Sequence, residues 1–144
     1  MSYIDLKSQI VSKLESIDDI QQVEEYPTTD VNGYPAAIVR SMSNDAEYET
    51  TCDNLETYRF IVYLLVENSE GFKGIKKARA IVEEVADIII DAFDNDEFLA
   101  GISLPSDRQM MGILPVTSII DEVEEGKYVE AEISLNIRIS KALS

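Results

Sequence analysis

The stretch that decides the fold is Val129-Glu-Ala-Glu-Ile-Ser-Leu-Asn-Ile-Arg-Ile139, in the last third of the chain. Apolar side chains alternate with polar ones through it without a break. Because successive side chains of a strand point to opposite faces of a sheet, this alternation predicts a strand with one buried and one wetted face. Strands of this kind are typical of antiparallel sheets.

The neighbouring segments predict partners for this strand. The run from Leu114 to Val123 is joined to it by Glu124-Glu-Gly-Lys127, a hairpin connection that contains a glycine. Leu55 to Glu67 predicts a second long strand, linked by an Asp53-Asn54 turn to an arm at Ala46 to Cys52. We therefore expect two hairpins.

Two further extended segments lie earlier in the chain. Tyr34 to Arg40 reads as an extended run, and Ile20 to Tyr26 as a short strand that Pro27 ends. Residues 98 to 112 contain glycine and proline and no sustained period, so we expect a long irregular loop there.

Two segments have helical spacing. Residues 2 to 17 carry apolar side chains three or four residues apart, and we expect the other side of this helix, including Lys7, to be solvated. Residues 72 to 93 carry a broader apolar stripe with the same period and predict a longer helix. The order of elements indicates an α+β fold in a single domain, 1–144: an antiparallel sheet with an N-terminal helix and one long central helix packed on one face.

The composition excludes many kinds of chemistry. The 144 residues hold 28 Asp and Glu against 12 Lys and Arg, for a net charge of −16, which disfavours a grip on nucleic acid through its phosphates. The chain has no His and one Cys, Cys52, so histidine triads, imidazole metal sites, disulfide frameworks and cysteine zinc sites are excluded.

The remaining reactive groups are mostly carboxylates. The acidic run at Asp91 to Glu97 lacks the glycine and the spacing of a calcium loop, and a solvated helix end is the better interpretation. Nothing places two carboxylates in a sheltered cleft, as acid–base catalysis requires. We expect no enzyme activity, no catalytic residue, no cofactor and no metal, and no segment is apolar enough over ~20 residues to cross a membrane.

Two features remain that suggest contact with another protein. In the Leu55 to Glu67 strand, both faces are apolar in the second half, and four basic residues gather at the start of the long helix. The alternative for the strand face is cover by a helix of the same chain. The alternatives for the basic cluster are a solvated helix face and phosphate binding. The candidate subunit-interface residues are Arg59, Ile61, Tyr63, Leu65, Lys73, Lys76, Lys77 and Arg79.

The order of these features resembles the tail terminator, or tail completion, proteins of long-tailed bacteriophages. The resemblance rests on the N-terminal amphipathic helix, on Gly33-Tyr34-Pro35-Ala-Ala-Ile-Val, on Tyr58-x-Phe60-x-Val62, on the helix from Ala78 to Asp94, and on the closing strand Val129 to Ile139. It covers nearly the whole chain and includes no catalytic motif.

This resemblance implies a neck protein that forms a hexameric ring between the tail tube protein and a head-completion or connector protein. DNA would pass through such a ring without specific binding, since six acidic subunits repel phosphate. The virion tail would be its location, after synthesis in the host cytoplasm. Two other hypotheses stay open: a head–tail adaptor or head-completion protein, and a small acidic adaptor or inhibitor that mimics DNA as a monomer or dimer.

Overall fold

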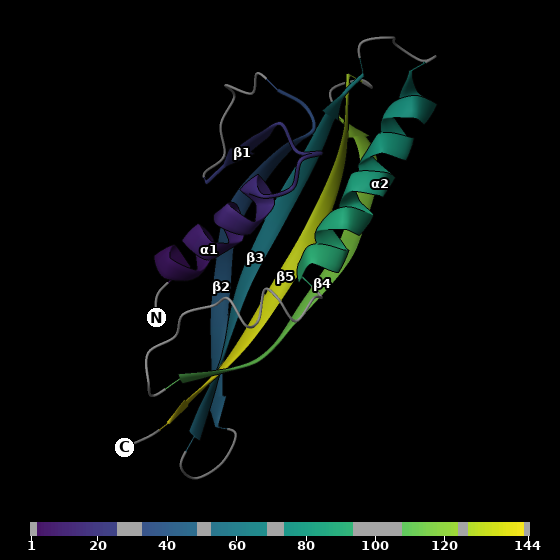
Figure 1. The fold of residues 1–144 in the computed structure, drawn as a ribbon. Coiled ribbons are helices and arrows are strands. Elements are labelled where there is room, and N and C mark those ends of the chain that lie inside the picture. The colour runs from purple at the N-terminus through teal and green to yellow at the C-terminus, as the bar shows by residue number, and fades with distance from the viewer. Residues whose placement is uncertain are drawn as a thin grey trace.

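The fold is a single sheet with helices on one of its faces (Figure 1). The computed structural model describes residues 3–25, 33–48, 53–68, 74–93, 108–123 and 127–142. Within these ranges five strands pair in the order β1-β2-β3-β5-β4. The strands are β1 Gln22–Glu24, β2 Ala36–Tyr48, β3 Asp53–Glu67, β4 Arg108–Val123 and β5 Tyr128–Ala142, and the helices are α1 Tyr3–Glu15 and α2 Ile75–Phe93.

The pairing confirms the predicted α+β class. β3 and β5 pair antiparallel over their full length. β2 pairs antiparallel with the other edge of β3, and β4 with the other edge of β5. β1 differs, because it runs parallel to β2 with Gln22 opposite Ala36. The backbone N–H of Gln21 donates to the carbonyl of Pro35 at 2.8 Å, so the segment entering β2 lies beside the start of β1 and both strands set out from the same end.

Two predicted boundaries were wrong on the β2–β3 side. The extended run to Arg40 and the first part of the arm after it form one strand, β2, with an irregularity between Ser41 and Asn44, and residues 49–52 of the arm lie outside the described part. Asp53 and Asn54, predicted as a turn, open β3, with Asp53 opposite Ala142. Pairing with the extended β5 overrides the turn preference of these residues.

The predicted loop over residues 98 to 112 was wrong in its last part. β4 already begins at Arg108, opposite Lys141, and residues 98–107 lie outside the described part. Two register shifts interrupt β4, which removes the regular alternation that would reveal a strand in the sequence. Pro115 is tolerated within it because β4 is an edge strand of the sheet.

The core lies between the helices and the face of the sheet that we call the inner face. α1 packs on β1 and β2, and α2 packs on β3, β4 and β5. Each fully buried aliphatic or aromatic side chain in this layer stabilises the fold by about 1.5–3 kcal/mol. Side chains with 0% exposure in this cluster include Leu6, Ile10, Leu14, Val62, Leu64, Val82, Ile89, Phe93, Ile133, Leu135 and Ile137.

The prediction that the side of α1 carrying Lys7 is solvated was wrong at this residue. Its exposure is only 6%, because the helix lies close against β1 and β2. Desolvation lowers the pKa of Lys7, and the nearby carboxylate of Glu25 opposes that shift.

Candidate functional site

The candidate site is the face of the sheet opposite the core, which we call the outer face. Both described helices lie on the other side of the sheet (Figure 1). Since Val62 and Leu64 point into the core, their neighbours Ile61, Tyr63 and Leu65 point to the outer face. No helix within the described ranges covers them. The alternative that a helix of the same chain covers this face of β3 therefore has no support in the described part of the chain.

An apolar row crosses the middle of the outer face. Ile61, Tyr63 and Leu65 are each partly exposed. Ile38 stands opposite Tyr63, and Ala36 opposite Leu65, and both β2 residues are buried although they do not belong to the core cluster. The row therefore spans two neighbouring strands and leaves part of its apolar surface in water.

Two carboxylates border the apolar row on β5. Glu130 stands opposite Leu65, and Glu132 opposite Tyr63. Desolvation raises the pKa of Glu130, and the neighbouring Glu132 carboxylate raises it further. This end of the outer face therefore holds negative charge against an apolar surface, which is unfavourable without a cation nearby.

Three arginines lie at the other end of the row. Arg40, Arg59 and Arg138 are all exposed and come from three adjacent strands. Arg40 is in register with Ile61. Arg138 is in register with Thr57, so each of the two stands diagonally beside Arg59 at about 7–8 Å between Cα atoms.

The sequence analysis missed two of these three arginines. Arg59 was predicted as an interface residue, whereas Arg40 and Arg138, which belong to distant segments of the chain, were not. Aligning the alternation of β5 with that of β3 would have placed Arg138 on the same face as Arg59. Only the register between the strands makes them neighbours.

Two tyrosines close the carboxylate end of the outer face. The rings of Tyr34 and Tyr128 have centroids 5.9 Å apart and are tilted by 35°. Tyr128 is in register with Glu67 at the end of β3. This contact joins the segment before β2 to the start of β5.

The described basic candidates of α2 occupy a different side of the molecule. Lys76 and Lys77 are exposed in the first turn of α2, Arg79 is partly exposed, and Lys73 lies outside the described residues. α2 turns its buried side, which includes Ala78, to the inner face of the sheet. The structure thus separates Lys76, Lys77 and Arg79 from Ile61, Tyr63 and Leu65, with the sheet between them.

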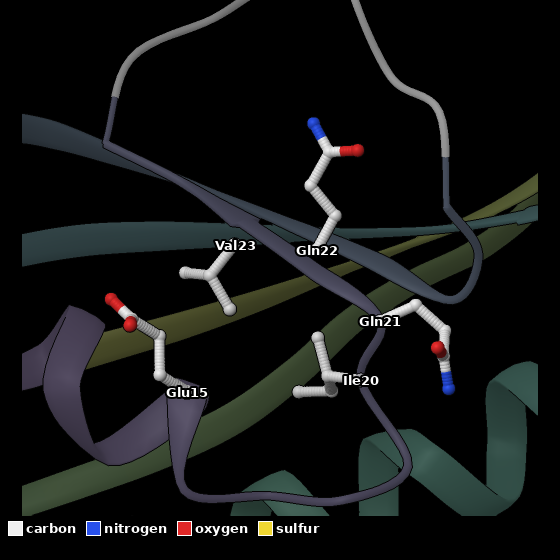
Figure 2. A pocket seen from close by; sticks show the side chains of 5 residues that line it. All are labelled: Glu15, Ile20, Gln21, Gln22 and Val23. Atoms are coloured by element: carbon white, nitrogen blue, oxygen red, sulfur yellow. The ribbon is translucent and has the colours of Figure 1, made fainter.

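A hollow beside β1 offers no chemistry. It has a volume of about 320 Å³ and is lined by Glu15, Ile20, Gln21, Gln22 and Val23. Figure 2 shows the Gln22 amide pointing away from the side chains of Ile20 and Val23. That amide donates to Glu24 Oε1 at 2.7 Å and accepts from the N–H of Gly33 at 3.2 Å, so its hydrogen bonds are made within the protein.

Among the residues whose positions are described, no group of three or more His, Cys, Asp or Glu is placed to hold a metal ion. Likewise, neither described helix combines the length and apolar character needed to span a membrane.

Comparison with known proteins yields a structural likeness. Neither a family model nor a curated protein sequence matches the chain. Among solved structures, a chain of a structure described as the virion of a native gene transfer agent particle superposes with a TM-score of 0.60 at 13% identity. The match covers 96% of this chain and 99% of that chain. At this identity it establishes that the two chains share a fold.

Proposed function

We propose that this protein is a structural subunit of a phage-like virion. More specifically, it terminates the tail tube of a long-tailed phage and forms a ring at the head–tail junction. The observation that carries the proposal is the likeness to a chain of the gene transfer agent virion over nearly the full length of both chains. The resemblance to tail terminator proteins supports the same role from the order of sequence features.

The outer face supports assembly. A single copy exposes part of the apolar row formed by Ile61, Tyr63 and Leu65, and a second copy would bury it. The basic residues Lys76 and Lys77 lie on the opposite side of the molecule. Two different patches on opposite sides are what a head-to-tail ring requires, since each copy presents one patch to each neighbour. Arg59, Lys73 and Arg79 complete the proposed interface.

The charge of the chain supports passage of DNA through the ring. At −16 for each copy, a hexamer would present an acidic wall that repels phosphate and lets the duplex pass without specific binding. The other partners are the tail tube protein and a head-completion or connector protein. The role is structural, without enzyme activity, and the mature location is the virion tail after synthesis in the host cytoplasm.

Reconstitution with tail tubes tests the function. Purified protein is added to tubes and examined by negative-stain microscopy and by size-exclusion chromatography with light scattering. We expect ring-shaped oligomers and rings at tube ends. A species of 16.1 kDa that persists at high concentration in the presence of tubes would overturn the proposal.

The other two hypotheses predict different outcomes. A head–tail adaptor or head-completion protein, which the virion likeness also supports, would bind the head connector and leave tube ends bare. A DNA-mimicking inhibitor is favoured only by the acidity of the chain, and it would be captured by a nucleic-acid enzyme and released by competing DNA.

A further inference from the structure

The solvent side of α2 carries its charges in a fixed order. Its exposed residues lie on one side of the helix at 100° per residue, and we call them the helix stripe. Basic residues occupy the first turn, a small apolar residue follows, and acidic residues fill the rest. The stripe consists of Lys76, Lys77, Ala80, Glu83, Glu84, Asp87 and Asp91.

The outer face carries charges in the reverse order along the same direction. Its acidic pair, Glu130 and Glu132, lies toward the end where Glu67 pairs with Tyr128. The apolar row lies beside this pair on β3, with Leu65 opposite Glu130 and Tyr63 opposite Glu132, and the three arginines lie further along. α2 begins at that same end, because it follows β3, and it runs alongside β5 (Figure 1). Where the helix stripe is basic, the outer face is therefore acidic, and the reverse holds further along.

The spacing of the charges also matches. On the outer face, the acidic pair and the arginines are centred about five strand residues apart, or about 17 Å at 3.4 Å per residue. On the helix stripe, the lysine pair and the acidic residues are centred about ten residues apart, or about 15 Å at 1.5 Å per residue.

We propose that the helix stripe of one copy docks on the outer face of the next copy, with both copies pointing the same way. Lys76 and Lys77 then meet Glu130 and Glu132 of the next copy, and the acidic part of the stripe meets its three arginines. Ala80, which is small, lies over the apolar row and lets the helix approach. This contact rests on the proposed ring and specifies which surfaces close it.

The contact would remove two unfavourable features of a single copy. It covers the exposed part of the apolar row, and it brings ammonium groups to the carboxylates of Glu130 and Glu132. A cation there would lower the raised pKa of Glu130 toward its ordinary value. Charges of this kind set orientation and partner choice, while burial of the apolar row provides most of the affinity.

A two-fold dimer of outer faces is the competing arrangement. With its strands antiparallel, it would also place the acidic pair of one copy over the arginines of the other. It leaves the ordered charges of the helix stripe without a role, and it closes on itself instead of forming a ring. The two arrangements differ in whether Lys76 and Lys77 matter.

Variants with exchanged charges distinguish the head-to-tail contact from the two-fold dimer. We would prepare E130K/E132K, K76E/K77E and the variant with all four substitutions, confirm folding by circular dichroism, and measure mass by light scattering at low salt. Each double variant should assemble at least tenfold more weakly than the wild-type protein. An equal mixture of the two should assemble again, because alternating copies restore every contact, and the fourfold variant should assemble alone.

A matched control carries the same change in charge elsewhere. Asp18 and Asp19 are exposed between α1 and β1, so D18K/D19K should assemble as the wild-type protein does. If E130K/E132K fails to fold, E130Q/E132Q takes its place and should also weaken assembly.

Several results would overturn the inference. Assembly of K76E/K77E as strong as that of the wild-type protein would overturn it, and so would a mixture of the two folded double variants that fails to assemble. Rescue of E130K/E132K by R59E/R138E in place of K76E/K77E would establish the two-fold dimer instead. If the wild-type protein forms rings and every charge-exchange variant assembles equally well, this contact is refuted and the proposed function stands. A wild-type protein that remains monomeric in the presence of tail tubes would refute both.

Discussion

Replacing apolar residues of the outer face should weaken assembly more than it weakens folding. We take the double variant Ile61→Thr/Leu65→Thr, because threonine keeps the strand preference while removing apolar surface. Both side chains are only partly exposed in one copy. Burying the apolar surface that they still expose is worth about 1 kcal/mol in total, a fraction of the ~1.5–3 kcal/mol for each whole side chain.

Each threonine hydroxyl adds a cost when a neighbouring copy removes it from water. At about 1 kcal/mol for each hydroxyl, the contact loses about 3 kcal/mol altogether. This corresponds to a dissociation constant about 100-fold higher. The free energy of unfolding of one copy should fall by about 2 kcal/mol, about 1 kcal/mol at each position.

A core variant provides the control. Ile133→Val/Ile137→Val removes one methylene from each of two fully buried side chains on the inner face, and should lower the free energy of unfolding by a similar 1–3 kcal/mol. Urea unfolding measures stability, and light scattering over a dilution series measures assembly. If both variants weaken assembly equally, the loss follows from stability, and the reasoning about the outer face is wrong.

Three further predictions concern single charged residues. Since desolvation raises the folded pKa of Glu130, this group costs stability as pH rises through that pKa. Glu130→Gln should therefore raise the urea midpoint of the monomer at pH 7, with no gain well below about 4.5. Since the folded pKa of Lys7 is lowered, burying its charge costs folding stability at neutral pH, and this cost fades as pH approaches 10.5. Lys7→Met should therefore raise the urea midpoint of unfolding at pH 7. A lower midpoint there would show that attraction to Glu25 outweighs desolvation. Asp87→Lys should weaken assembly about tenfold by light scattering with an unchanged thermal midpoint, and unchanged assembly would contradict the pairing of the helix stripe with the arginines.

The sequence alone determined the elements whose side chains report their own burial. The unbroken alternation of β5 indicated a strand with a buried face, and its inward residues Ile133, Leu135 and Ile137 are indeed fully buried. The periodic stripe of α2 likewise indicated a long helix on the core. The apolar second face of β3 was visible in the same way, and so was the exclusion of histidine chemistry.

Tertiary structure decided what depends on a neighbour distant in the chain. Asp53 and Arg108 lie in strands because β5 supplies their pairing partners, although local preference favours a turn and a loop. Lys7 is buried because α1 lies close on β1 and β2. The arginines of the outer face form one group only through the register of three strands. A local pattern records which side of an element is apolar, whereas pairing and register arise from contacts between segments that the pattern cannot relate.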